Sequence, residues 1–169
     1  MSRDLASALQ ERWAEYLRFY REGAIYSAFV RLSEIANCLQ HASVPSDLAS
    51  RWANALGEVK IKPDDLRSIS EEVRRKIERV RRMLGVSTGL IYEEFLFAIT
   101  IRTELDLLAH YLAERGAACL ADADSLGADL VAMAGSPRSS SAYRSAQASA
   151  RQNWGLPLYS KWLGSDATQ

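Results

Sequence analysis

The sequence is poor in the residues that most catalytic and metal sites require. It contains two cysteines, Cys38 and Cys119, and two histidines, His41 and His110, among 169 residues. The cysteines lie far apart in apolar-periodic segments, so we expect two buried thiols rather than a disulfide framework. Zinc sites usually take their ligands as two closely spaced pairs. Cys38 and His41 are three residues apart, but His110 and Cys119 are nine apart, so we predict no metal site.

Sequence motifs for catalysis and cofactor binding are also missing. The chain has no glycine-rich phosphate loop, no pair of catalytic acids and no cluster of metal ligands. No serine or cysteine nucleophile lies at an identifiable spacing from His110, which leaves covalent catalysis without its usual partners. We therefore predict a protein without a cofactor, and we expect a non-enzymatic role first.

Long apolar runs are absent as well. A helix that crosses a membrane needs roughly 18 or more consecutive apolar residues. The most apolar segment, residues 88–115, is interrupted by charged residues, among them Glu93, Glu94, Arg102, Glu104 and Asp106. The N-terminus enters an amphipathic pattern directly and shows no apolar signal-peptide core. These absences predict a cytoplasmic protein that does not contact a membrane.

Apolar residues recur at helical spacing along most of the chain, which predicts an all-α fold. Helices are expected over about residues 2–22, 25–41, 46–57, 63–85 and 88–115, and an Ala-rich segment follows Gly116. Gly23 predicts a break between the first two helices, and Ser2 and Ser46 are the expected N-caps. The segment 88–115 is apolar on nearly every side, as buried helices are.

These patterns predict a bundle of five or six helices around the central helix, residues 88–115. A chain of 169 residues is long enough for one domain with a hydrophobic core. We assign residues 1–135 to the bundle. Residues 136–169 are assigned to a linker and an irregular C-terminal tail, because the composition becomes rich in Ser, Pro and Arg after Gly135.

Three polar residues at four-residue spacing, Arg102, Asp106 and His110, form a seam along the predicted central helix. Residues four apart lie on one helix face, so Asp106 can reach both neighbours and could orient His110 for acid–base catalysis. These three are therefore the candidate catalytic residues. The alternative interpretation is that they are paired polar groups at the most polar edge of a buried helix.

The densest basic run of the chain lies in the predicted helix 63–85. It supplies four candidate nucleic-acid contacts: Arg74, Arg75, Arg79 and Arg82. Basic helices bind phosphate backbones, but Glu71, Glu72 and Glu78 are interleaved with the arginines at the spacing of helical ion pairs. The run fits either a nucleic-acid-binding helix or a solvated, salt-bridged outer face.

A short segment directly after this helix resembles the turn and recognition helix of tetracycline-repressor-type DNA-binding regulators. The residues that carry the resemblance are Gly85-Val86-Ser87-Thr88-Gly89-Leu90-Ile91-Tyr92 and Phe95. The resemblance implies that DNA is read through this element. A glycine that ends one helix, followed by a serine that caps the next, produces the same letters for structural reasons alone.

The C-terminal region is basic and aromatic, and it contains no acidic residue between Leu130 and Ser165. Its predicted partner-binding residues are Trp154, Leu156, Tyr159, Trp162 and Leu163. Its cations extend the candidate nucleic-acid surface: Arg138, Arg144, Arg151 and Lys161. Such a segment suits aromatic anchors in a groove of another protein, base stacking with phosphate contact, or folding back onto its own bundle.

Taken together, these patterns favour a non-enzymatic helical interaction module, or a small subunit of a larger protein assembly. Its tail is expected to contact another protein or a second copy of the chain. Nucleic-acid binding by the basic helix, residues 74–82, and the tail is the alternative. An enzyme that uses His110 with Asp106 and Arg102 is the third expectation.

Overall fold

A computed structural model describes residues 4–86, 92–116, 128 and 140–163 of the chain. Its helices are α1 (Leu5–Arg21), α2 (Ile25–Cys38), α3 (Ser46–Gly57), α4 (Pro63–Val86), α5 (Tyr92–Ala113), α7 (Ser140–Trp154) and the short 3-10 helix η1 (Lys161–Leu163). No strand occurs among the described residues. The predicted all-α helical bundle is therefore confirmed.

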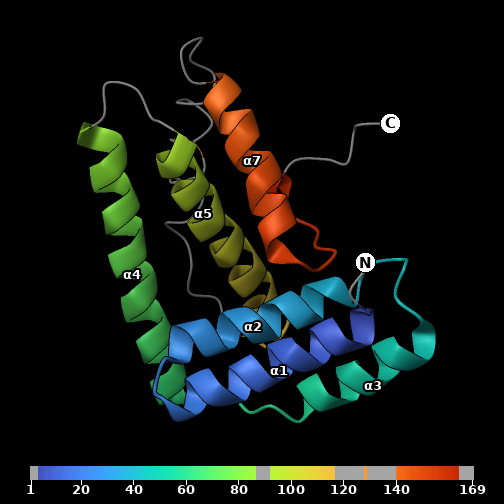
Figure 1. Ribbon diagram of the computed structural model, residues 1–169. Helices are drawn as coiled ribbons and strands as arrows, with labels where there is room; N and C mark the ends of the chain where they lie inside the picture. The colour runs from blue at the N-terminus through green and yellow to red at the C-terminus, as the bar shows by residue number, and fades with distance from the viewer. Residues whose placement is uncertain (1–3, 87–91, 117–127, 129–139, 164–169) are drawn as a thin grey trace.

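The first two helices form an antiparallel hairpin, and the rest of the molecule is arranged around it (Figure 1). Gly23 lies at the corner with φ of +79°, a conformation that glycine adopts without the steric cost of a side chain. The predicted break between α1 and α2 is confirmed. Helix α3 packs beside the hairpin through Trp52, whose ring centroid lies 5.8 Å from that of Trp13 in α1.

Two of the expected helix caps differ from the structure. The N-cap of α1 is Asp4, whose carboxylate accepts a hydrogen bond from the N–H of Ala6 at 3.3 Å. The helix therefore starts later than the expected cap, Ser2. For α3 the capping position is held by Pro45, and Ser46 is already the first helical residue. Proline sets an extended conformation before the helix without any side-chain hydrogen bond, so the prediction of Ser46 as the cap is wrong.

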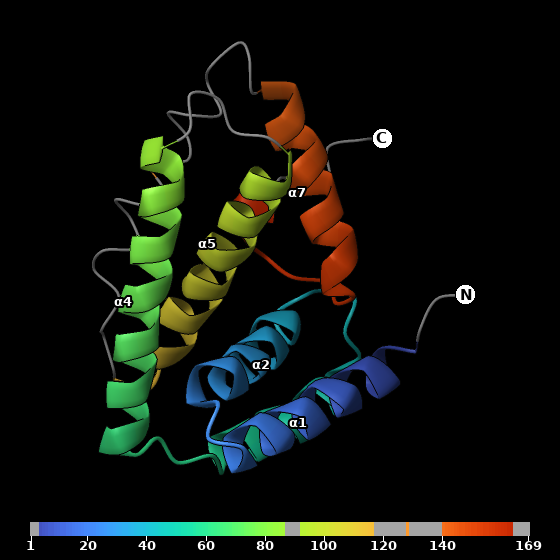
Figure 2. The same cartoon turned by 60° about the vertical axis from the view of Figure 1, so that its left-hand side comes forward.

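Helix α5 is the buried helix at the centre of the bundle. It contacts α2, α4, α7 and η1, and both views show it between α4 and α7 (Figures 1 and 2). Its buried apolar residues lie on all sides of the helix: Phe95, Ala98, Ile99, Ile101, Leu105, Leu107, Leu108, Tyr111 and Leu112. The predicted central helix is confirmed over residues 92–113, and residues 88–91 lie outside the described part.

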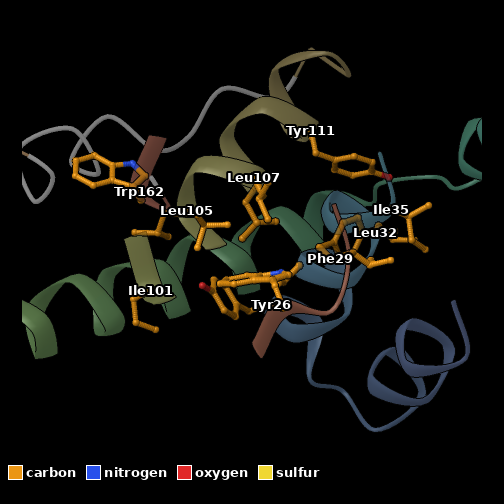
Figure 3. Close-up of a cluster of buried hydrophobic side chains, with 14 of the residues drawn as sticks. Tyr26, Phe29, Leu32, Ile35, Ile101, Leu105, Leu107, Tyr111 and Trp162 are labelled. Carbon is orange, nitrogen blue, oxygen red and sulfur yellow. The ribbon is translucent and has the colours of Figure 1, made fainter. Parts of the chain in front are cut away.

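The main core cluster joins α2 to α5. Figure 3 shows Tyr26, Phe29, Leu32 and Ile35 of α2 in one cluster with Ile101, Leu105, Leu107 and Tyr111 of α5 and with Trp162 of η1. Each large apolar side chain that is buried in this way stabilises the fold by about 1.5–3 kcal/mol. The cluster fixes α5 against the hairpin and leaves the edges of α5 for α4 and α7.

Helix α4 is attached along a single narrow seam. Its buried apolar residues are Ile69, Val73, Ile77 and Val80, which recur at every third or fourth position. Near its N-terminus the buried Asp65 accepts a hydrogen bond from the hydroxyl of Tyr20 at 3.2 Å and from the N–H of Lys62 at 3.1 Å. The remaining faces of α4 are open to solvent over most of its length.

Candidate functional site

The C-terminal region is more regular than we predicted. Residues Ser140–Trp154 form α7, which packs along α5. Its inward face carries Ala146 and Ala150, which are 0% and 1% exposed and lie one helical turn apart. Small side chains let the two helices approach closely, and tertiary packing supplies the stability that the weak helical pattern of this Ser- and Arg-rich segment lacks. The expectation of an irregular tail is corrected over this range.

After α7 the chain turns at Gly155, which has φ of +69°, and runs back over the bundle. We call residues 156–163 the C-terminal strap. Of the five predicted partner-binding residues, four are buried in the core of this chain: Trp154, Leu156, Trp162 and Leu163. Tyr159 is 51% exposed. The described conformation therefore uses the aromatic tail to cover its own bundle.

The strap is held largely through its main chain. The side-chain amide of Asn37 accepts a hydrogen bond from the N–H of Tyr159 at 2.7 Å and donates one to its carbonyl at 3.1 Å. The carbonyl of Trp162 accepts from Gln147 at 3.1 Å, and that of Leu163 accepts from Arg151 at 2.7 Å. These bonds fix the strap against α2 and α7 while Trp162 and Leu163 fill the core.

The polar seam of α5 is divided between the strap and the solvent. Arg102 is 3% exposed, and its guanidinium carbon lies 4.7 Å from the ring centroid of Trp162. Asp106 accepts a hydrogen bond from the hydroxyl of Ser160 at 3.1 Å. His110 is exposed and pairs with Glu114 at 3.3 Å. The seam therefore anchors the strap, and His110 has partners other than Asp106.

The predicted nucleic-acid contacts of the basic helix lie on the outside of α4. Arg74, Arg75, Arg79 and Arg82 are all exposed. Two of the four have local partners: Arg75 pairs with Glu72 at 3.3 Å, and the guanidinium carbon of Arg79 lies 4.9 Å from the ring centroid of Phe97. The expected salt-bridged outer face is present in part, and a strongly basic ridge remains beside it.

The basic residues of the C-terminal region do not join this ridge as one surface. Arg144 is exposed on α7, which both views place on the opposite side of α5 from α4 (Figures 1 and 2). Arg151 is directed to the strap, where it bonds the carbonyl of Leu163. Arg138 and the side chain of Lys161 lie outside the described part of the structure. Among the described residues, the exposed cations of α4 and α7 form separate groups.

A pocket that none of the predicted sites includes lies where the hairpin meets α5 and α7. It has a volume of about 390 Å³. Its lining residues come from four helices: Arg12, Arg31, Glu34, Leu96, Thr100, Glu104, Ala150, Asn153 and Trp154. We call it the charged pocket. It combines two guanidinium groups and two carboxylates with an apolar wall.

Glu34 organises one side of the charged pocket. It is 1% exposed, and both of its oxygens have partners. Oε1 lies 2.8 Å from Arg31 and accepts a hydrogen bond from the indole N–H of Trp154 at 2.7 Å. Oε2 lies 3.0 Å from Arg31 and 3.0 Å from Arg12. Burial raises the pKa of Glu34, and the attraction of Arg31 and Arg12 acts in the opposite direction. A buried carboxylate needs such partners to offset its desolvation. Its role is to fix Arg12, Arg31 and Trp154 in place.

Glu104 forms the other acidic side of the pocket. The hydroxyl of Tyr26 donates to one of its oxygens at 2.6 Å. Burial raises the pKa of Glu104, while this hydrogen bond and the charges of Lys76 and Arg31 lower it. Burial and the nearby Glu104 raise the pKa of Tyr26 well above its ordinary value, so its hydroxyl stays a donor. The second oxygen of Glu104 has no hydrogen-bond donor within the described ranges.

The sequence contains a signal for this pocket that hydrophobic periodicity does not reveal, namely acidic residues on apolar helix faces. Glu34 lies four residues from Val30 and from Cys38, so it shares a helix face with two buried apolar residues. Glu104 likewise interrupts the most apolar helix of the chain. A carboxylate on a buried face implies partners from neighbouring helices, because an unpaired buried charge costs several kcal/mol.

The described cysteine and the second histidine lie outside both the charged pocket and the α4 surface. Burial raises the pKa of the Cys38 thiol to about 11, and the ring of His41 stacks on Tyr159 at 4.9 Å. Cys119 lies outside the described residues, as do residues 87–91 of the segment that resembles a DNA-recognition helix. Within the described ranges, no group of three or more potential metal ligands occurs, and no helix is both long and apolar enough to span a membrane.

The chain was compared with protein-family models, with curated proteins and with solved structures. None of the three comparisons gave a match.

Proposed function

We propose that this chain is a non-enzymatic helical interaction module that binds another protein through the outward face of α4. The supporting observation is the line of exposed charged residues on that helix: Arg67, Glu71, Arg74, Arg75, Glu78, Arg81 and Arg82. Arg67 and Arg82 are 15 residues apart in this helix, which at 1.5 Å per residue gives a ridge of about 22 Å. We call this surface the α4 ridge.

The mixture of charges on the α4 ridge favours a protein partner. Glu71 and Glu78 are exposed among the arginines, and each would repel a phosphate backbone. A protein surface of mixed charge can pair with both signs. Arginine is also enriched in protein interfaces, where its planar guanidinium group forms paired hydrogen bonds with carboxylates. A partner with acidic residues at helical spacing would match this ridge.

Nucleic acid is the second candidate for the same surface. Five of the seven residues of the α4 ridge are arginines, and neutralising phosphates with arginine releases counterions and gives salt-dependent binding. This candidate uses α4 without the tail, because the strap covers the bundle and Arg151 is engaged with it.

Co-purification with matched variants tests the proposal. The triple variant Arg74→Gln, Arg75→Gln and Arg82→Gln removes three charges from the α4 ridge. The triple variant Arg21→Gln, Arg51→Gln and Arg144→Gln removes three charges that are also exposed, from α1, α3 and α7, and serves as the control. We expect a defined protein partner to be retained by the wild type and the control and lost by the ridge variant, with circular dichroism unchanged.

Two outcomes would count against a protein partner on α4. Equal retention of every partner by both variants would place the contact elsewhere. The ridge variant could instead lose binding to a polynucleotide while no protein partner is lost. Such a loss, measured by a gel shift at about 50 mM and 200 mM salt, would favour the second candidate.

A further inference from the structure

The charged pocket has the dimensions and chemistry of a small-molecule site. Its volume of about 390 Å³ lies at the small end of the range for ligand pockets, roughly 300–1,000 Å³. It joins an apolar wall to convergent charged groups, which is the usual construction of such sites. We propose that it binds a short aliphatic amine in its ammonium form, with the ammonium group on Glu104. This inference concerns a different surface from the α4 ridge.

The other charged groups of the pocket are already engaged with one another. Both oxygens of Glu34 are bound by Arg31, Arg12 and Trp154. Arg12 also pairs with Glu15 at 3.2 Å and donates to the carbonyl of Trp154 at 2.6 Å. Arg31 pairs with Glu15 at 2.9 Å. Since each guanidinium group has two carboxylate partners, the arginines do not form an open anion site.

Glu104 is the carboxylate that remains available to a ligand. Tyr26 occupies one of its oxygens, and the other receives no hydrogen bond from the described part of the chain. The pocket lining carries two carboxylates and two guanidinium groups, and Glu15, which pairs with both arginines, adds a third carboxylate beside it. The arginines are therefore shared between Glu15 and Glu34.

Lys76, a further cation that acts on Glu104, does not fill this position. Lys76 attracts Glu104, but its ammonium group lies over the ring of Tyr26, 4.8 Å from the centroid, and Lys76 is not among the residues that line the pocket. A ligand ammonium group can therefore approach the open oxygen of Glu104 from the pocket side. An ion pair formed there would be partly desolvated and so stronger than an exposed one.

The rest of the pocket favours an aliphatic chain behind the ammonium group. Leu96 and Ala150 supply apolar surface, and Trp154 adds a ring that its hydrogen bond to Glu34 holds in place. The hydroxyl of Thr100 donates to the carbonyl of Leu96 at 2.7 Å, so its polar atom is already engaged within α5. A four-carbon amine fits this division of polar and apolar surface.

Three isosteric probes separate charge from shape. We would titrate the full chain with n-butylamine at neutral pH, with butan-1-ol and with butyrate, and follow backbone amides and the indole N–H of Trp154 by NMR. The expected result is a saturable shift of Trp154 and of Glu104 with butylammonium, and no saturable shift with butyrate. Equal shifts with all three probes, or none with the amine, would overturn the proposal.

Variants identify the residue that holds the amine. Glu104→Gln keeps an acceptor for Tyr26 but removes the charge, and we expect it to weaken butylammonium binding by about tenfold or more, the strength of a hydrogen bond to a charged group. Glu93→Gln, at an exposed position of the same helix, is the matched control and should bind as the wild type does. Equal affinity of Glu104→Gln and wild type would overturn the assignment.

A second pair of variants covers the case in which Glu104→Gln does not fold. Asn153 lines the pocket and is exposed, so charges there are tolerated by the core. Asn153→Asp should tighten butylammonium binding, and Asn153→Arg should weaken it. Changes in the opposite order, or identical affinities, would contradict cation binding in this pocket.

Discussion

Trp162 is the residue whose loss tests the packing of the strap most directly. Its side chain is 5% exposed, and it covers the guanidinium group of Arg102, which is itself 3% exposed. Burying a tryptophan removes about 150–250 Å² from water, which at about 25 cal/mol per Å² corresponds to about 4–6 kcal/mol. Aromatic-to-alanine changes in protein cores cost about 3–5 kcal/mol. Because water can reach Arg102 once the strap loosens, we expect Trp162→Ala to lower the free energy of unfolding by about 3 kcal/mol.

Urea denaturation followed by circular dichroism measures this loss as a lower midpoint at constant slope. Tyr159→Ala is the matched control, because its side chain is 51% exposed and the strap is held there by main-chain bonds to Asn37. We expect that control to lose less than about 1 kcal/mol. A loss below about 1 kcal/mol for Trp162→Ala, or equal losses for both variants, would refute the packing of the strap on α5.

The contact between Arg102 and Trp162 can be separated from general burial by a double-mutant cycle. Arg102→Met keeps much of the length of the side chain and removes its charge. A partly desolvated cation–π contact contributes about 1–2 kcal/mol, so the summed losses of the two single variants should exceed the loss of the double variant by about 1 kcal/mol. Additive losses would show that the ring and the guanidinium group act independently.

Three further predictions follow from buried polar groups. Asn37→Ala should speed hydrogen exchange at the amide of Tyr159, measured by NMR, because its acceptor is lost; unchanged exchange would contradict the 2.7 Å bond. Because burial raises the pKa of Glu104 above its unfolded value, the folded state binds its proton more tightly. Its contribution to stability is therefore present at low pH and is lost as the pH rises through the raised pKa. Urea titrations from pH 4 to 7 should show this fall in wild type and a smaller one in Glu104→Gln. In a Cys119→Ser background, Cys38, with its pKa near 11, should react with a thiol reagent at pH 8 only as fast as the chain opens, and rapid labelling of the native protein would contradict its burial.

The parts of the fold that follow from local pattern were predictable from the sequence. The all-round apolar character of residues 88–115 predicted a buried central helix, and α5 buries residues on every side. Apolar residues at helical spacing over residues 63–85 predicted α4, and four of these residues, Ile69, Val73, Ile77 and Val80, are buried. Gly23 predicted the corner of the hairpin because a left-handed turn favours glycine. In each case the information lies within one helix or one turn.

The C-terminal region could not be predicted in the same way. Helix α7 has few large apolar residues, and it is stabilised by close approach to α5 through Ala146 and Ala150. The strap depends on contacts between residues 122 apart in sequence, those of Asn37 with Tyr159. Helix propensity and hydrophobic periodicity do not predict such contacts. The sequence showed that the tail is aromatic and basic. Only the fold shows that these aromatic residues cover the bundle of the same chain.

Glu34 illustrates how a charged site can be anticipated even where its partners are distant. It shares a helix face with Val30 and Cys38, so spacing alone implies that its carboxylate is buried. A buried carboxylate without partners costs several kcal/mol, so a stable fold must bring donors to it. Here the donors come from α1, α2 and α7, with Trp154 lying 120 residues away in sequence. The same reasoning applied to Glu104 leads to Tyr26 for one oxygen. The other oxygen receives no hydrogen bond from the described residues, and it is the one assigned to the ammonium group of the ligand.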